Sequence, residues 1–131
     1  MAQINLVVVT PETTTVDAEV DSIMVPLIDG LAGILPGHAP MIGRLGPGEL
    51  RTVTGSASER YYVDGGFVQV ENNKVSVLTG RSVPVAEIDV AAAEAALKEA
   101  QEQEAGNADL MELKNKAIAQ ARAQIRMVKG E

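Results

Sequence analysis

The spacing of apolar residues changes near residue 85, and this change is what most constrains the fold. Upstream, apolar and polar residues alternate, as in Ile4–Val8 and Val16–Val20, which is the pattern of half-buried strands. Downstream, Ile88–Lys98 is rich in alanine, a strong helix former. The sequence therefore predicts a mainly β plus α chain, with an N-terminal antiparallel β-sandwich over 1–85 and a C-terminal two-helix antiparallel hairpin over 86–131.

Short runs of period two, separated by turn residues, predict the strands of the sandwich. The predicted strand segments are 4–8, 16–20, 23–27, 50–53, 61–63, 67–71 and 74–78. The clearest hairpin turns at Asn72-Asn73, because asparagine tolerates the left-handed backbone that a two-residue turn requires. Thr10–Thr13 and Gly65-Gly66 are expected to mark further corners. Many short strands with Gly and Pro between them are typical of a sandwich or flattened barrel.

The helical half divides at Gly106-Asn107, which breaks the helical pattern. The second helix is expected to carry one apolar stripe, formed by Leu110, Leu113, Ala117, Ala121, Ile125 and Val128. Residues 87–105 have six acidic side chains against one basic, and residues 106–131 have five basic against three acidic. The net charges of −5 and +2 suit antiparallel packing. A short hairpin with exposed ion pairs gains little stability, so we expect it to need the sandwich or a partner for support.

Composition weighs against several classes of function. A net charge of −7 disfavours a general role in nucleic-acid binding. With no cysteine and one histidine, we expect neither a thiolate nucleophile nor a zinc site. We expect no catalytic site, because no nucleophile–base set stands out, and no sugar-binding platform, because the chain has no Trp and two Tyr. No apolar run is long enough to span a membrane, and the N-terminus has no signal or transit pattern.

Residues 33–48 combine Gly and Pro with core-forming apolar side chains and hold the only histidine, His38. Pro and Gly are unfavourable inside a helix, and the apolar residues argue against a flexible linker. The segment therefore predicts a short strand, a rigid turned loop over 37–40 and a second short strand. A rigid loop with apolar flanks is suited to contact a partner.

With these features, the chain resembles the epsilon subunit of the rotary ATP synthase along its whole length. The motifs that carry the resemblance are Gly33–Ile42, Pro47-Gly48, Gly65–Val70, Val75–Thr79 and Ile88-Asp89. The resemblance implies a non-catalytic central-stalk subunit that couples proton-driven or sodium-driven ring rotation to ATP synthesis. It also implies that the helical hairpin is mobile and inhibits ATP hydrolysis.

The resemblance names partners and a location as well. The expected partners are the gamma subunit, the c-subunit ring and the catalytic alpha/beta head, with no nucleic acid. The subunit would be peripheral on the cytoplasmic face of the inner (plasma) membrane, or alternatively on the stromal face of thylakoids, without inserting into the membrane.

The interface residues that the resemblance implies, toward gamma or the c ring, are Asp29, Leu31, Pro36, Gly37, His38 and Met41. Leu31 stands where the family usually has a glutamate that meets the ring, so the contact would rest on Asp29 or on apolar packing. Alternatively, Leu31 packs into the sandwich. For His38, the alternative to an interface role is a hydrogen bond to the local backbone.

Some family members bind ATP on the hairpin through an Ile/Leu-Asp-x-x-Arg-Ala pattern and arginines of the second helix. This chain keeps Asp89 of that pattern, but Ala92 replaces the arginine. Arg122 and Arg126 lie four apart, on one helical face, and could hold a phosphate or pair with acidic residues of the first helix. We expect no required cofactor and at most weak ATP binding. No phosphate-binding loop is present, so the sequence does not predict a nucleotide hydrolase.

Overall fold

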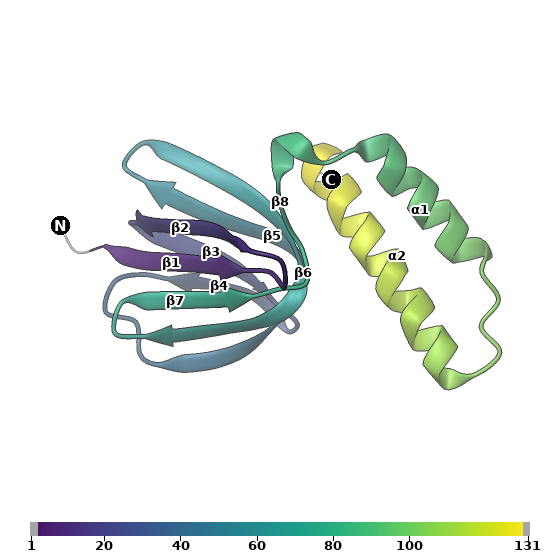
Figure 1. The fold of residues 1–131 in the computed structure, drawn as a ribbon, viewed down its shortest axis with the longest axis horizontal. Coiled ribbons are helices and arrows are strands. Elements are labelled where there is room, and N and C mark those ends of the chain that lie inside the picture. The colour runs from purple at the N-terminus through teal and green to yellow at the C-terminus, as the bar shows by residue number, and fades with distance from the viewer. Residues whose placement is uncertain (1–2, 130–131) are drawn as a thin grey trace. The chain divides into compact units, whose positions relative to one another are not determined.

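The computed structural model describes residues 3–129, which fall into two compact units that divide between Pro84 and Val85. The first unit contains the strands β1 (Ile4–Val9), β2 (Thr14–Val20), β3 (Ser22–Leu27), β4 (Gly30–Ile34), β5 (Met41–Thr54), β6 (Ala57–Glu71), β7 (Lys74–Leu78) and β8 (Ser82–Pro84). The second contains the short 3₁₀ helix η1 (Val85–Glu87) and the helices α1 (Val90–Glu102) and α2 (Ala108–Lys129). The predicted fold class, a β-sandwich followed by a helical hairpin, is confirmed, except that β1 and β7 pair in parallel rather than antiparallel (Figure 1).

The strands form one continuous sheet in the order β2-β1-β7-β6-β5-β3-β4, with β8 paired to β6. The two longest strands, β5 and β6, pair antiparallel along almost their whole length. The C-terminal part of β6 pairs with β7, whereas its middle pairs with β8. These two strands therefore run through both layers of the sandwich, which encloses the core as the sheet folds over (Figure 1).

The strand lengths differ from the prediction. Segments 50–53 and 61–63 are not separate short strands but parts of β5 and β6. Gly65-Gly66 is not a corner between strands, because β6 continues through both residues with φ values of 99° and 113°. A Cβ on Gly66 would lie 1.9 Å from the carbonyl oxygen of Leu78. The two glycines thus allow β7 to approach β6 closely in the middle of a long strand. The pattern of alternating apolar residues is interrupted at these glycines, so it wrongly predicts that the strand ends there.

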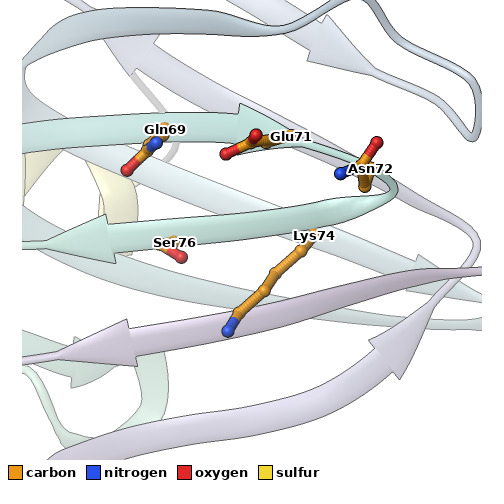
Figure 2. A pocket seen from close by; sticks show the side chains of 5 residues that line it. All are labelled: Gln69, Glu71, Asn72, Lys74 and Ser76. Carbon is orange, nitrogen blue, oxygen red and sulfur yellow. The ribbon is translucent and has the colours of Figure 1, made fainter.

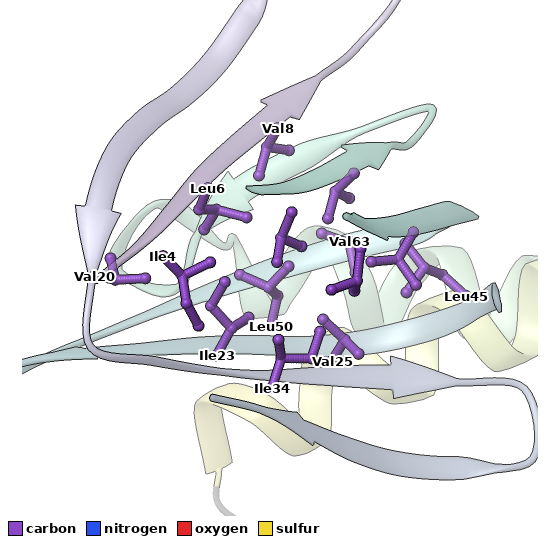
Figure 3. Close-up of a cluster of buried hydrophobic side chains, with 14 residues drawn as sticks. Ile4, Leu6, Val8, Val20, Ile23, Val25, Ile34, Leu45, Leu50 and Val63 are labelled. Carbon is purple, nitrogen blue, oxygen red and sulfur yellow. The ribbon is translucent and has the colours of Figure 1, made fainter. Parts of the chain in front are cut away.

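The core of the sandwich is one aliphatic cluster between the two layers, as the sequence pattern indicates (Figure 3). Its buried members come from seven strands, at alternating positions within β1, β3 and β7: Ile4, Leu6, Val8, Val20, Ile23, Val25, Ile34, Leu45, Leu50, Val63, Val68, Val70, Val75 and Val77. The tight turn predicted at Asn72-Asn73 is confirmed, with φ values of 51° and 59°. Each left-handed residue is an asparagine, which pays a smaller steric penalty there than most residues.

The helices of the second unit begin at side-chain caps. The Asp89 carboxylate accepts a hydrogen bond from the Ala92 N–H at 3.0 Å, and the Asn107 side chain accepts one from the Leu110 N–H at 2.9 Å. Each cap satisfies one of the backbone donors that an isolated helix leaves unpaired. Gly106-Asn107 therefore separates the helices as predicted.

The apolar stripe predicted on α2 is wrong in part. Leu110, Leu113 and Val128 are exposed, whereas the buried side chains of the hairpin are Ala93, Ala100, Ala121, Ala123 and Met127. The buried side chains of the hairpin are thus four alanines and one methionine, and each alanine contributes little apolar area. Among the described residues its one ion pair joins Lys129 and Glu94 at 3.2 Å, between half-exposed side chains. Such a pair adds at most about 1 kcal/mol.

We predict that Gly66→Ala destabilises the sandwich by about 3 kcal/mol or more, because the new methyl group overlaps the backbone of β7. The free energy of unfolding in urea measures the effect. Gly80→Ala is the control, since nothing lies within 4 Å of a Cβ there. Equal stability of the two variants would show that the strands can separate at Gly66 without cost.

Candidate functional site

The segment from Leu35 to Pro40, between β4 and β5, forms the turned loop that the sequence predicts. The His38 N–H donates to the Leu35 carbonyl at 3.1 Å, and Gly37 adopts a φ of 84° that favours glycine. His38 Nδ1 lies 2.7 Å from the Ala39 carbonyl oxygen. The imidazole is therefore held by local backbone, and it remains half-buried rather than fully covered.

Asn73 ties this loop to two other parts of the sandwich. Its side-chain oxygen accepts a hydrogen bond from the Gly37 N–H at 2.7 Å, and its carbonyl accepts one from the Asn5 N–H at 2.9 Å. The residue thus connects the 35–40 loop, the β6–β7 turn and the start of β1. The sequence predicts the turn at Asn72-Asn73 but carries no signal for the hydrogen bond to Gly37, since 36 residues separate the partners.

The structure places the six predicted interface residues in two groups. Pro36, Gly37, His38 and Met41 lie in or next to the 35–40 loop, whereas Asp29 and Leu31 lie at the opposite end of β4. A five-residue strand separates the groups by about 17 Å. Leu31 is 70% exposed, so the alternative that it packs into the sandwich is wrong.

Met41 and its neighbour Ile42 face opposite sides of β5. Met41 is half-buried and packs against the core cluster, whereas Ile42 is 75% exposed. A contact with a partner at this position would therefore be made mainly by Ile42, which sequence reasoning did not single out as a site residue. The alternation of β5 is the signal that could have found it, because Met41 and Ile42 cannot both face the core.

Three exposed apolar side chains line up across the outer face of the layer that contains β1 and β7. Phe67 on β6 pairs with Leu78 on β7, which pairs with Val9 on β1. All three side chains, the apolar row, are exposed, and Arg44 on β5 pairs with Phe67 at its end. The row lies beside a polar hollow of about 450 Å³ lined by Gln69, Glu71, Asn72, Lys74 and Ser76 (Figure 2).

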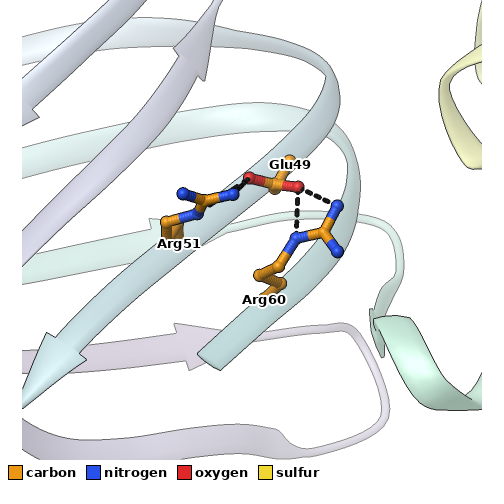
Figure 4. Close-up of polar contacts among 3 residues, drawn as sticks. All are labelled: Glu49, Arg51 and Arg60. Carbon is orange, nitrogen blue, oxygen red and sulfur yellow. Dashed lines mark hydrogen bonds and ion pairs between the residues drawn. The ribbon is translucent and has the colours of Figure 1, made fainter. Parts of the chain in front are cut away.

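A charged cluster lies on β5 and β6 in the other layer. Arg51 and Arg60 are direct cross-strand partners, and like charges at such positions repel. Glu49 bridges them, with one carboxylate oxygen 3.1 Å from Arg51 and the other 2.5 Å from Arg60 (Figure 4). Next along β6, burial together with the hydrogen bond and charge of Glu59 raises the pKa of Tyr61 to about 12. Its hydroxyl therefore stays protonated at neutral pH and donates to Glu59.

The residues suggested for nucleotide binding are either engaged in a helix cap or exposed on the hairpin. The Asp89 carboxylate is used as the helix cap, and Arg122 and Arg126 are exposed on α2. Within residues 3–129 neither arginine forms an ion pair, so the predicted alternative of pairing with the first helix is wrong. The same described residues contain no group of three or more His, Asp or Glu that could hold a metal ion. None of the helices described is both long and apolar enough to cross a membrane.

Comparisons with known proteins point to the same family, and together they cover most of the chain. Residues 3–85 match the family described as ATP synthase, Delta/Epsilon chain, beta-sandwich domain. The chain is 48% identical over 123 residues to the ATP synthase epsilon chain of Rhodopirellula baltica, covering 94% of this chain and 96% of that one. It is 41% identical over 106 residues to the epsilon chain of Myxococcus xanthus, covering 81% and 78%.

Among solved structures, the chain is similar to one in the Euglena gracilis mitochondrial ATP synthase, in a structure of its OSCP, F1 and c-ring. The TM-score is 0.83 at 26% sequence identity, and the alignment covers 94% of this chain and 79% of that chain.

We predict that Asn73→Gly loosens the 35–40 loop without unfolding the sandwich. Glycine keeps the left-handed turn, while the hydrogen bond to Gly37, worth about 1 kcal/mol, is lost. Amide hydrogen exchange at Gly37 should become about fivefold faster. Asn72→Gly is the matched control, since it relaxes the same turn and leaves the Gly37 bond in place; equal exchange in both variants would show that the bond does not hold the loop.

Proposed function

The chain belongs to the ATP synthase epsilon-chain family, and on that premise we propose that it is a central-stalk subunit that links the c ring to gamma. In this role it has no catalytic site of its own and transmits ion-driven rotation, by protons or sodium, to the catalytic head. It would sit peripherally on the cytoplasmic face of the inner membrane. The observation that carries this proposal is the apolar row together with Ile42. Exposing these side chains to water adds no stability to an isolated subunit, whereas burying them against a partner does.

The apolar row and Ile42 are the surface that we assign to gamma. Ile42, Phe67, Leu78 and Val9 expose between 36% and 75% of their area on one layer. Contiguous exposed apolar residues on a small protein are characteristic of protein–protein interfaces. Arg44 at the end of the row, and the polar hollow beside it, provide a polar rim for such a contact.

The two ends of β4 are the surfaces that we assign to the rest of the rotor. At one end, Asp29 follows the exposed Ile28 and precedes the exposed Leu31, so one carboxylate stands among apolar side chains. Because Leu31 replaces the glutamate expected there, ring contact would rest on apolar packing and on Asp29. At the other end, the hydrogen-bonded loop presents Pro36, Gly37 and His38 in one conformation, which lowers the entropic cost of binding.

The hairpin is the part that we propose to regulate ATP hydrolysis. Apart from Met127, the side chains fully buried in it are alanines, which bury little apolar area, so the free-energy cost of separating the two helices is small. Leu110, Leu113 and Val128 are already exposed and are available to a second partner. Arg122 and Arg126 are exposed on the same helix, so an extended α2 would bring basic groups to an acidic surface of the catalytic head.

The same arginines bear on nucleotide binding, which we propose to be weak. Ala92 removes one expected cation, and the Asp89 carboxylate is engaged as a cap. Loss of one charged hydrogen bond lowers affinity about ten- to a hundredfold.

We predict that Ile42→Glu and Phe67→Glu each weaken binding to gamma at least about tenfold, because a carboxylate would be buried in an apolar contact. Both positions are exposed, so the free energy of unfolding should change by less than about 1 kcal/mol. Surface-immobilised gamma with the soluble variants measures the affinity. Ser58→Glu, an exposed position in the other layer, is the control for added charge. Unchanged binding of both row variants would place the gamma contact elsewhere.

For nucleotide, we predict that calorimetric titration of the chain with ATP gives millimolar affinity or none. Arg126→Ala should then differ little from Lys116→Ala, which removes another exposed cation of the same helix. Micromolar affinity that Arg126→Ala abolishes and Lys116→Ala does not would show that another group compensates for the missing arginine.

A further inference from the structure

The sheet described over residues 3–129 has two open edges, β2 and β4, and they differ in protection. On β1, the Asn5 N–H bonds to Asn73 on the β7 side, so the backbone groups of Asn5 face β7 and those of Ile4, Leu6 and Val8 face β2. In the register of β1 and β2, the outward backbone groups of β2 then belong to residues 15, 17 and 19. Two of these are Asp17 and Glu19, and charged side chains on an edge discourage further strand pairing.

The outward backbone groups of β4 belong to Leu31 and Gly33. The Ile28 N–H donates to Arg44 on β5, so even-numbered positions of β3 face β5 and odd-numbered positions face β4. Pro26 lies opposite Leu31 in this register. Because Pro26 has no N–H, it has no backbone donor to offer a neighbouring strand. Ala32, between the two, bonds inward to Val25. The N–H and C=O groups of Leu31 and Gly33 therefore point away from the sheet.

Nothing in the composition of β4 blocks an added strand. Gly30–Ile34 has no charge and no proline, and its Leu31 side chain is exposed. Beside the strand lies a mostly apolar hollow of about 300 Å³, lined by Ser22, Ile23, Met24, Gly33, Ile34, Leu35, Arg51 and Val53. At Gly33 a Cβ would touch only the end of Met24, at 4.0 Å. Gly33 thus leaves an open notch at the edge, with exposed Met24 and Leu35 around it.

We propose that the β4 edge accepts an extended segment of a rotor subunit as an added strand, bonded to Leu31 and Gly33. An apolar side chain of that segment, opposite Gly33, fills the notch and packs on Met24. This inference rests on the proposed central-stalk function and specifies how one partner is held, through main-chain hydrogen bonds combined with one side-chain pocket.

The net charge of the sandwich indicates which kind of segment the β4 edge would bind. Residues 1–84 hold five Lys and Arg against nine Asp and Glu, a net charge of −4, and the whole chain has −7. Asp29 lies one residue before β4. A neutral or basic segment is therefore favoured, whereas two copies of this chain would repel each other as they paired.

The test removes one outward-facing N–H from each edge strand, β4 and β2, by substitution with proline. Gly33→Pro removes a donor of the β4 edge, and Glu19→Pro removes one of the β2 edge; neither donor bonds within the sheet, and proline is tolerated at such edge positions. Urea unfolding checks that both variants are folded. Affinity is measured for purified ATP synthase stripped of this subunit, and amide exchange at Leu31, Ala32 and Gly33 is compared between the free and the assembled chain.

Gly33→Pro should bind at least about tenfold more weakly than the unaltered chain, and Glu19→Pro should bind equally well. The amides of Leu31 and Gly33 should exchange fast in the free chain and slowly in the complex, with Ala32 slow in both. If Gly33→Pro binds normally and both amides stay fast in the complex, the strand-addition proposal is wrong while the proposed function stands. If the free chain is a dimer that Gly33→Pro dissociates, the occupant is a second copy and the proposal is also wrong. Failure of the unaltered chain to bind would instead contradict the proposed function.

Discussion

The close approach of Gly66 to the Leu78 carbonyl is the contact on which the sandwich depends. A side chain at this point would overlap β7, and Gly65 and Gly66 both adopt positive φ values. Their freedom lets β6 continue from the stretch that pairs with β8 to the stretch that pairs with β7. One long hairpin of β5 and β6 therefore serves both layers. The aliphatic core, the 35–40 loop and the apolar row all take their positions from these two strands and their neighbours.

Much of the fold could be predicted from local patterns, because alternation and turn chemistry act over a few residues. The Asn72-Asn73 turn, the alternating core positions of β1 and the break at Gly106-Asn107 are examples. The continuous path of β6 through Gly65-Gly66 could not be predicted, since its cause is a neighbour on another strand. Likewise, large apolar residues on α2 suggested a buried stripe, whereas close packing of alanines leaves Leu110 and Leu113 exposed.

The location of the candidate site was predicted from the family resemblance. Its hydrogen bonds and the direction of its side chains were predicted only in part from the sequence pattern. Residues 35–40 form a turned loop as expected, but the acceptor of the Gly37 N–H is Asn73, which lies in a distant turn. Ile42, rather than Met41, is the side chain that faces outward. The apolar row appears only when β1, β6 and β7 are aligned in register. An analysis of one segment at a time cannot detect a surface that several strands form together. Sequence reasoning therefore favoured the Gly- and Pro-rich loop over the apolar row.

The division of roles between sandwich and hairpin is tested most directly by ATP hydrolysis in complexes assembled with the full chain or with a chain ending at Pro84. The core cluster lies wholly within residues 4–77, so we expect the shortened chain to fold and assemble. Hydrolysis should then be faster than with the full chain, while ion-driven ATP synthesis is retained. Equal hydrolysis rates in the two assembled complexes would contradict the regulatory role of the hairpin.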